Sequence, residues 1–258
     1  MKIIKPDLSV IICTEGKKES LKKTLESILV LDVSIQVIIV TPLTFEALKS
    51  VIKESNLGKI PFQHVKDEGI GIYEAMNLGI ERASSRYSIF LNDDDKFLAE
   101  AGILGSYLTE QEYIDAYLAP VNLVSPSSQS TRIGKVFNPD SIKFGRMPTS
   151  HQGQIWGTLY LRDMSGYNTK ICFGLIKFQL RVCADFEFYV RATLNKPNFR
   201  ILPLPIVEAE LGGFSDTHPH RRMFETFLVL LRYRIHNPVN CLLYLLRFEV
   251  SYFLQRFK

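Results

Sequence analysis

The first half of the chain alternates short apolar runs with amphipathic stretches, and this alternation limits the fold more than any other feature. Residues 8–13 form an apolar run suited to a buried strand, and residues 20–31 repeat apolar side chains at helical spacing. The same rhythm then predicts strands at 36–40, 62–65 and 87–91, and helices at 45–53 and 72–83. Strands that alternate with helices are typical of a mainly parallel sheet whose helices cover its faces.

Beyond about residue 115 this rhythm loosens. We expect strands at 117–124 and 133–137, a helix at 184–194, a strand at 199–207 interrupted by prolines, and a corner at Gly212 and Gly213. No internal repeat or low-complexity tract is present in the sequence. This half is therefore expected to accept a substrate rather than to repeat βα units.

The bulk composition allows one large α/β domain or two smaller ones. The chain has 258 residues, of which 46% are hydrophobic, so it can bury a substantial core without disulfides. Its four cysteines are scattered and form no C-x-x-C pair, as in a cytosolic protein with reduced thiols. The N-terminal apolar run is short and lacks a cleavage-site pattern, so no signal peptide is expected.

The positive charge is concentrated at the C-terminal end. Residues 218–258 contain seven Lys or Arg residues and two Glu residues, whereas the whole chain carries +4. This distribution argues against a general nucleic-acid-binding surface. Residues 224–257 are rich in Leu, Phe, Tyr and Arg, and break at Asn237-Pro238. Two amphipathic helices fit this pattern, and they can lie on a membrane surface, pack on the rest of the chain or join a homodimer.

The strongest local signal is the acidic cluster Asn92-Asp93-Asp94-Asp95, which directly follows an apolar strand. Ligands bind at the carboxyl ends of strands in open α/β sheets. Adjacent carboxylates repel one another, and a Mg²⁺ or Mn²⁺ ion relieves that repulsion while leaving places for phosphate oxygens. The alternative is a solvated turn that caps the following helix.

A second signal is the glycine-containing segment 67–80. It begins like a dinucleotide-binding fingerprint at Gly69 and Gly71, but Glu74 stands at the third glycine position. The Rossmann interpretation therefore fails. The segment still offers a glycine turn, a helix start and the amide of Asn77.

These motifs resemble family 2 glycosyltransferases of the bacterial polysaccharide type. The resemblance rests on D-E-G-I-G-I-Y-E-A-M-N-x-G-I-x-x-A at 67–83, followed by F-L-N-x-D-D at 90–95, and on S-V-I-I-C-T with E-S-L-K-K-T-L-E-S-I-L inside 9–29. Further matches are His151-Gln152, the helix start at 184–187 and Gly-Gly-Phe-Ser at 212–215. Together they cover about residues 8–215 in the family's order.

The resemblance implies a GT-A fold, an α/β architecture with a mainly parallel central sheet flanked by helices, here with a C-terminal helical extension. Residues 1–115 would form the nucleotide-sugar-binding half, 116–217 the acceptor-binding half and 218–258 the basic helices. The implied activity is inverting hexosyl transfer, dependent on Mn²⁺ or Mg²⁺, from a nucleotide-diphosphate sugar, UDP-sugar being favoured. The implied acceptor is a polysaccharide, lipopolysaccharide or lipid-linked glycan. The implied location is cytoplasmic or peripheral on the inner face of the membrane.

The family's pattern also assigns roles to individual positions. Asp94 and Asp95 match the metal ligands, and Asp185 matches the base that takes the acceptor's proton, with Glu187 as its competitor. A lid or acceptor contact is expected from His151, His218, His220 and Arg221. The expected donor-binding residues are Thr14, Glu15, Thr41, Asp67, Tyr73, Asn77, Asn92 and Asp93.

One departure from the family's pattern keeps two alternatives open. The family carries an acidic residue after its second strand, where this chain has Thr41-Pro42-Leu43. A catalytically degenerate GT-A module that binds a sugar nucleotide or a partner protein is one alternative. A metal-dependent nucleotidyltransferase is the other, and Gly16-Lys17-Lys18 weakly resembles its basic glycine loop.

Overall fold

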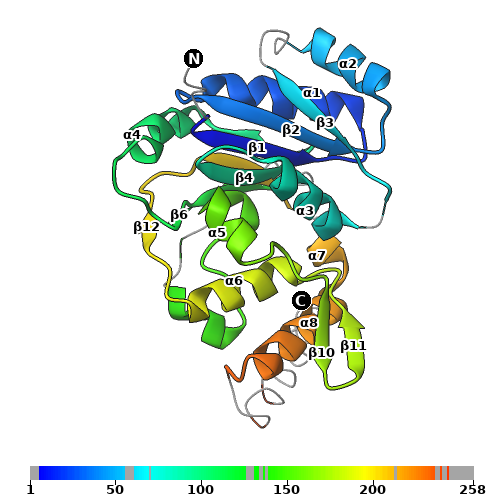
Figure 1. Ribbon diagram of the computed structural model, residues 1–258, viewed down its shortest axis with the longest axis vertical. Coiled ribbons are helices and arrows are strands. Elements are labelled where there is room, and N and C mark those ends of the chain that lie inside the picture. The colour runs from blue at the N-terminus through cyan, green and yellow to red at the C-terminus, as the bar shows by residue number, and fades with distance from the viewer. Residues whose placement is uncertain are drawn as a thin grey trace. The chain divides into compact units, whose positions relative to one another are not determined.

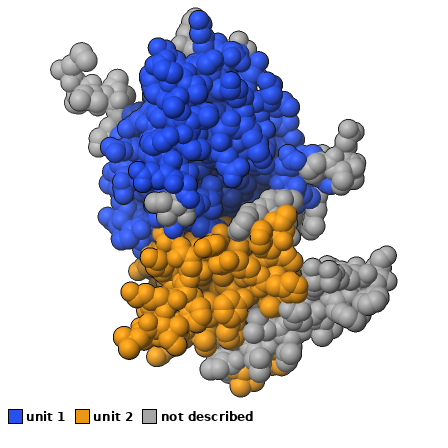
Figure 2. Space-filling model, turned by 90° about the vertical axis from the view of Figure 1, so that its right-hand side faces the viewer, with its two compact units in different colours: residues 1–136, 149–166, 197–211 blue, residues 137–148, 167–196, 212–258 orange. Residues whose placement is uncertain are grey.

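The computed structural model of the chain divides into two compact units. It describes residues 6–55, 61–69, 71–125, 131–133, 136, 139–211, 214–235, 239 and 243. Unit 1 comprises Met1–Val136, Thr149–Gly166 and Pro197–Leu211, and unit 2 comprises Phe137–Pro148, Tyr167–Lys196 and Gly212–Lys258 (Figure 2). The division of the chain into donor, acceptor and tail regions stays a prediction.

Unit 1 is built on a seven-stranded sheet in the order β12-β6-β9-β4-β1-β2-β3 (Figure 1). Its first four strands in the chain are β1 (Leu8–Cys13), β2 (Ile35–Thr41), β3 (Phe62–Lys66) and β4 (Tyr87–Asn92). β1 pairs in parallel with both β2 and β4, and β2 pairs in parallel with β3. All four strands consequently end at the same edge of the sheet, which is the edge where open α/β sheets bind ligands.

Helices cover both faces of these parallel strands. They are α1 (Lys18–Ser27), which continues into a 3₁₀ turn (Ile28–Val30), α2 (Phe45–Glu54) and α3 (Ile72–Arg82). Because the connection from β3 to β4 runs back across β2 and β1, the right-handed crossover rule puts α3 on the face opposite α1 and α2. α3 contacts β1 and β2.

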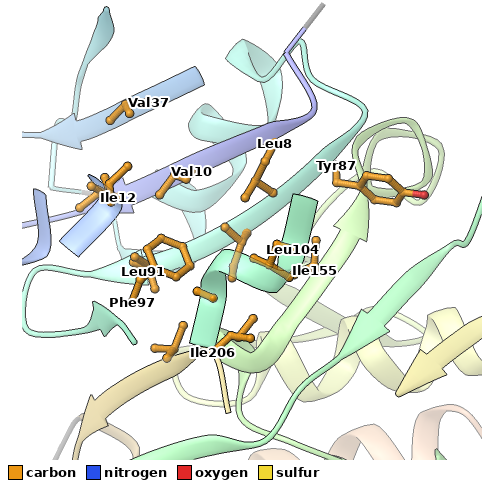
Figure 3. Packing of buried hydrophobic residues seen from close by; sticks show 14 of the residues in the cluster. Leu8, Val10, Ile12, Val37, Tyr87, Leu91, Phe97, Leu104, Ile155 and Ile206 are labelled. Carbon is orange, nitrogen blue, oxygen red and sulfur yellow. The ribbon is translucent and has the colours of Figure 1, made fainter. Parts of the chain in front are cut away.

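Side chains of β1 alternate between the two faces, as the strand period requires. Leu8, Val10 and Ile12 belong to the core cluster that includes Leu21 and Leu25 of α1 (Figure 3). Ile11 points the other way, toward α3, where it lies against Gly79. The strand is buried on both faces, which explains its near-continuous apolar sequence.

The remaining strands of unit 1 complete two sheets. β6 (Ala116–Leu118), β9 (Gln154–Gly157) and β12 (Phe199–Ile201) extend the large sheet, where β9 alone among the described strands runs antiparallel to its neighbours. A smaller sheet has the order β5-β13-β7-β8. Its strands are β5 (Lys96–Phe97), β7 (Val121–Val124), β8 (Thr131–Ile133) and β13 (Val207–Glu210). The short helices α4 (Leu104–Leu108) and α5 (Thr158–Asp163) complete unit 1.

Two segments that were each expected to form one strand form two strands instead. The run at 117–124 splits into β6 and β7, and the run at 199–207 splits into β12 and β13, with one member of each pair in each sheet. Pro120 lies between β6 and β7, and Pro203 and Pro205 lie between β12 and β13. Proline has no amide donor, so these residues interrupt both ladders. The expected strand at 133–137 overlaps β8 only at Ile133, and residues 134, 135 and 137 lie outside the described part.

Unit 2 contains the helix α6 (Ala184–Leu194), the hairpin strands β10 (Lys170–Phe173) and β11 (Ile176–Gln179), the short α7 (Phe214–Thr217) and α8 (Pro219–Arg232). A 3₁₀ segment (Pro139–Phe144) also belongs to it. No helix among the described residues is long and apolar enough to cross a membrane. The Gly212-Gly213 corner and most of the predicted second tail helix lie outside the described residues.

The close approach of α3 to β1 yields a stability prediction. A Cβ added at Gly79 would lie 2.3 Å from Ile11 Cγ2, so Gly79→Ala must displace α3 from the sheet. We expect a loss of about 1–3 kcal/mol in the free energy of unfolding, measured by urea denaturation. In an uncrowded helix the same change would stabilise by up to about 1 kcal/mol.

The control for this prediction is the double variant Ile11→Ala/Gly79→Ala. Removing the Ile11 methyl groups makes room for the new Cβ, so Gly79→Ala should cost less in that background. Additive losses would contradict the proposed contact.

Candidate active site

The acidic cluster forms a turn that closes on itself at the carboxyl end of β4. The backbone amide of Asn92 donates to Asp95 Oδ2 at 2.8 Å, and the Thr24 hydroxyl of α1 donates to the Asp95 carbonyl at 2.7 Å. Asp95 is 2% exposed. Its carboxylate therefore holds the turn from inside, while Asp93 and Asp94 lie nearer to solvent.

The burial of Asp95 changes its acidity. The pKa of the Asp95 carboxyl is raised to about 7, mainly by burial and also by the neighbouring charges of Asp94 and Asp93. Hydrogen bonds from the Asn92 amide and the Gln152 side chain act in the opposite direction. Gln152 is 8% exposed, so it is a buried partner of this turn.

The loop after β1 is tied to the same turn. The Thr14 hydroxyl donates to Asp93 Oδ2 at 2.7 Å and accepts from the Gly16 amide at 2.8 Å. Gly16 has φ +92°, and a Cβ there would lie 2.7 Å from the Leu43 side chain, so the turn requires glycine. Glu15, one residue earlier, is exposed at this edge.

Asp94 is the exposed carboxylate of the turn. Partial burial of the Asp94 carboxylate raises its pKa, and the negative charges of Asp93 and Glu210 act in the same direction. The Lys17 ammonium lowers the pKa of Asp94. The negative charge near Asp94 therefore comes from two parts of the chain: Asp93 follows β4, and Glu210 is the last residue of β13. A cation would find favourable electrostatics here.

The donor atoms fit a divalent cation that is shared with a phosphate ligand. In the described part of the chain, no three His, Cys, Asp or Glu side chains converge as in a closed metal cage. Mg²⁺ is commonly held by one or two carboxylates, with substrate phosphates and water filling the other positions. Asp94 offers hard oxygen atoms of that kind, whereas the Asp95 carboxylate is turned inward on the Asn92 amide.

The ends of β2 and β3 bring two more predicted residues to this edge. The Asp67 amide donates to the Thr41 carbonyl at 3.0 Å, so the two residues are neighbours. The Thr41 hydroxyl is buried and accepts from the Leu43 amide at 3.3 Å. Asp67 Oδ1 accepts from the Gly69 amide at 2.9 Å, which shapes the turn into α3.

The predicted residues on α3 lie deeper. Tyr73 is 7% exposed. Asn77 Oδ1 lies 2.4 Å from the position that a Cβ would take at Gly166, so Asn77 packs against the turn that follows α5. Gly71, with φ +152°, precedes α3, and the Glu74 carboxylate lies over it.

His151 and Gln152 also reach the carboxyl edge. They belong to a 3₁₀ turn (His151–Gly153) that leads directly into β9. Because β9 runs antiparallel to β4, the residues before its first position lie where β4 ends, and the turn contacts β4. The strands thus bring His151 to the same edge of unit 1 as Asp94.

In unit 2, α6 carries the two candidates for the base. Asp185 is partly exposed, and its Oδ1 accepts from the Phe186 amide at 2.8 Å. Glu187 is 1% exposed, and its Oε1 accepts from Asn168 Nδ2 at 2.8 Å and Arg191 Nε at 3.0 Å. Tyr233 also donates to Glu187. Glu187 is therefore engaged inside unit 2.

The segment before Asp185 is held by a buried carboxylate on α8. Glu225 is 2% exposed and accepts from the backbone amides of Arg181, Val182 and Cys183 at 2.8 to 3.1 Å. The Cys183 thiol donates to the Arg222 carbonyl at 3.3 Å. α8 thus fixes the start of α6.

The residues expected to act as a lid have different environments in unit 2. Arg221 Nε donates to Glu225 Oε1 at 2.7 Å, so its guanidinium belongs to the contact that holds the start of α6. His218 and His220 are exposed at the first turn of α8, and His218 Nδ1 lies 3.0 Å from the Thr217 hydroxyl.

Sequence reasoning missed several residues that organise these sites. Gln152 was noted only as part of a motif, and Glu210 and Glu225 were not singled out. The i, i+4 spacing of Arg221 and Glu225 is the one local signal that indicates a pair. Nothing local links Glu225 to residues 181–183, which lie more than forty positions away.

Known proteins similar to the chain are glycosyltransferases. It is 31% identical over 168 residues to a "PGL/p-HBAD biosynthesis glycosyltransferase" of Mycobacterium bovis, and equally so to its Mycobacterium tuberculosis counterpart. The match covers 63% of this chain and 59% of the relative, so the chain spans less than two thirds of its curated relatives. No family model matches the chain.

Solved structures resemble the chain over most of its length. Staphylococcus aureus TarS in complex with UDP-GlcNAc has a TM-score of 0.60 at 15% identity and covers 93% of this chain and 71% of that one. The mannosyltransferase PcManGT of Pyrobaculum calidifontis, in complex with GDP-Man and Mn²⁺, has a TM-score of 0.61 at 12% identity and covers 91% and 66%.

The contact between α8 and the start of α6 yields a second prediction. Glu225→Ala leaves three backbone amides, two of them buried, without their acceptor. We expect it to lower the free energy of unfolding by about 2–4 kcal/mol. The matched control is Glu81→Ala, which removes an exposed helical carboxylate and should change stability by less than about 0.5 kcal/mol. Equal losses in the two variants, measured by chemical denaturation, would refute the role given to Glu225.

The mainly parallel sheet, the flanking helices and these similarities confirm the expected architecture: the chain has the GT-A fold and resembles bacterial glycosyltransferases of that type.

Proposed function

We propose that the chain is an inverting glycosyltransferase that moves a sugar from a nucleotide-diphosphate donor to a glycan or lipid-linked acceptor. The observation that carries the proposal is the edge of the sheet in unit 1. There, parallel strands bring Thr14, Asp67 and the acidic turn to the same edge. The similar solved structures were obtained with UDP-GlcNAc or GDP-Man, which supports a nucleotide-sugar donor for this chain.

On the donor side, Asp94 holds a divalent cation together with the diphosphate. Mn²⁺ or Mg²⁺ in that position offsets the negative charge that develops on the departing diphosphate. Asp95 serves the same site indirectly: its buried carboxylate fixes the turn through Asn92 and Gln152, so Asp94 is presented without rearrangement. Asp93, held by Thr14, stabilises the junction with the loop after β1.

The nucleoside is held on the β2 and β3 side. A carboxylate is missing after β2, and the Thr41 hydroxyl is buried against the Leu43 amide. Asp67 follows β3 and is a neighbour of Thr41, so it brings a carboxylate close to the end of β2. We assign it the contact with the base or ribose, with UDP favoured as the nucleotide.

On the acceptor side, Asp185 acts as the general base. It takes the proton from the acceptor hydroxyl while that oxygen bonds to the anomeric carbon and the bond to the diphosphate breaks, which inverts the configuration. Glu187 is the poorer candidate, because it is 1% exposed and already accepts from Arg191, Asn168 and Tyr233. A base must reach the substrate.

The two alternatives make different predictions. A degenerate GT-A module would bind a sugar nucleotide without transferring the sugar, and a nucleotidyltransferase would need its basic loop at Gly16-Lys17. Leu43 covers Gly16, and neither alternative finds support among the similar proteins named above.

The donor-binding prediction separates Asp94 from Asp95. We expect UDP with Mn²⁺ to raise the melting temperature of the chain, and Asp94→Asn to abolish the metal-dependent part of that shift. Asp95→Asn keeps an oxygen that accepts from the Asn92 amide, so it should retain most of the shift. GDP and CDP, each with and without Mn²⁺, serve as the comparison nucleotides.

Two results would contradict this arrangement. Loss of the metal-dependent shift in Asp95→Asn but not in Asp94→Asn would exchange their roles. No stabilisation of the unaltered chain by any nucleotide would remove the basis for a nucleotide-sugar transferase.

The catalytic prediction concerns Asp185. Asp185→Asn should lower kcat for sugar transfer by at least about 10²-fold while leaving the nucleotide-induced thermal shift unchanged. Donor hydrolysis and transfer can be followed by release of the nucleoside diphosphate. Intact transfer by Asp185→Asn would reassign the base, and a thermal shift without transfer in the unaltered chain, across donors and acceptors, would favour the degenerate module.

A further inference from the structure

The hairpin of unit 2 ends in an exposed apolar tip. β10 and β11 are antiparallel, with Phe173 opposite Ile176, and they are joined by Gly174 and Leu175. Gly174 has φ +58°, as a tight turn requires. Leu175 is 100% exposed and Ile176 is 61% exposed. A fully exposed leucine next to a largely exposed isoleucine is unfavourable in water alone.

The exposed tip lies at one end of an apolar face of the hairpin, and α8 packs against the other end of this face. Ile171 and Phe178 are opposite each other on one face of the hairpin. Ile171 is 4% exposed, and the Phe178 ring lies 6.1 Å from the Phe224 ring of α8 in an edge-to-face arrangement. Phe173 and Ile176 lie on the same face, two residues nearer the tip. α8 therefore covers the inner end of the face and leaves its outer end uncovered.

The charged residues of the hairpin and of the residues that flank it in the chain are basic. Residues 167–183 include Lys170, Lys177 and Arg181, all exposed, and contain no Asp or Glu. On the neighbouring α8, the one acidic residue is Glu225, which is 2% exposed and paired with Arg221. The surface beside the apolar tip thus presents positive charge to its surroundings.

We infer that the tip of this hairpin docks on an anionic lipid bilayer. Leu175 and Ile176 would enter the interfacial region, while Lys170 and Lys177, which share the opposite face of the hairpin, would meet lipid phosphates. Two apolar side chains bind a bilayer only weakly, so the basic residues are required as a second attraction. A protruding tip suits insertion into lipid better than it suits a protein surface, which would need a matching pocket.

This inference is independent of the transferase chemistry, because it concerns residues outside the proposed donor site. It also differs from an attachment through the C-terminal helices, because the hairpin precedes them in the chain. A peripheral contact of this kind would bring the enzyme to the membrane surface, where lipid-linked acceptors are found.

The experiment is vesicle co-sedimentation of the full chain with phosphatidylcholine vesicles that contain 0 or about 30% phosphatidylglycerol. We expect binding to the anionic vesicles that falls as salt rises. Leu175→Ser/Ile176→Ser should reduce the partition coefficient at least about ten-fold. Lys170→Gln/Lys177→Gln should reduce it about ten- to thirty-fold.

Matched controls change the same residue types elsewhere. Leu159→Ser/Ile201→Ser replaces two exposed apolar side chains of unit 1, and Lys49→Gln/Lys53→Gln replaces two exposed lysines of α2. Both controls should bind as the unaltered chain does. Circular dichroism spectra and melting temperatures of all variants establish that they are folded.

Three results would overturn the inference. The first is absence of binding to anionic vesicles, and the second is binding that the hairpin variants leave unchanged. The third is a fall in molar mass of the Leu175→Ser/Ile176→Ser variant in light scattering, from dimer to monomer, without loss of vesicle binding. That result would assign the tip to contact with a second copy of the chain.

Discussion

The parallel pairing of β1 with β2 and β4 is the constraint on which the proposed chemistry depends. Parallel strands end at one edge, so residues from distant parts of the sequence, such as Thr14 and Asp93, meet there and form a hydrogen bond of 2.7 Å. The two-sided burial of β1 makes this arrangement rigid, because its apolar residues pack on helices on both faces. The sheet therefore presents the acidic turn from a fixed support.

The carboxylates of this chain divide into two groups by their surroundings. Asp95, Glu187 and Glu225 are each almost fully buried and accept hydrogen bonds from nearby donors. A buried carboxylate is tolerated only with such partners, and removing them is costly. Asp95 and Glu225 position backbone segments, whereas Glu187 holds the side chains of Asn168, Arg191 and Tyr233. Asp94 and Asp185 retain exposure and sit beside positioned segments, which is what binding and proton transfer require.

Much of the fold in unit 1 follows from local sequence, because each βα unit carries its own pattern. The strands β1 to β4 were predicted to within one or two residues at each end, since their apolar runs are bounded by polar turns. β9 was missed. It has four residues that include Gln154 and Gly157, and its buried position depends on neighbours far along the chain. The hairpin of β10 and β11 was missed as well, because each strand has only four residues and the helix that packs on it, α8, lies far along the chain.

The candidate residues, too, were predictable where a local motif marks them and not where their role depends on distant neighbours. Motif order placed Asp67 and the acidic turn after successive strands, and the topology puts the ends of those strands on the same edge of the sheet, with β1 and β2 between them. The resemblance made Asp94 the first choice for the metal ligand and Asp95 a helper, but the inward turn of the Asp95 carboxylate depends on burial, which adjacent aspartates do not reveal in the sequence. Nor could the sequence reveal that Glu225 holds the segment before Asp185, because that contact joins two elements without a shared motif.

The central claim is that Asp94 holds a divalent cation together with a nucleotide diphosphate at the carboxyl edge of the sheet. The most direct test is a crystal structure of the chain with UDP and Mn²⁺, with the metal located by its anomalous scattering. We expect an anomalous peak at coordination distance, about 2.0–2.3 Å, from a carboxylate oxygen of Asp94 and from diphosphate oxygens, with Asp95 still turned toward the Asn92 amide. A peak coordinated by Asp95 instead, or UDP bound away from this edge, would contradict the claim.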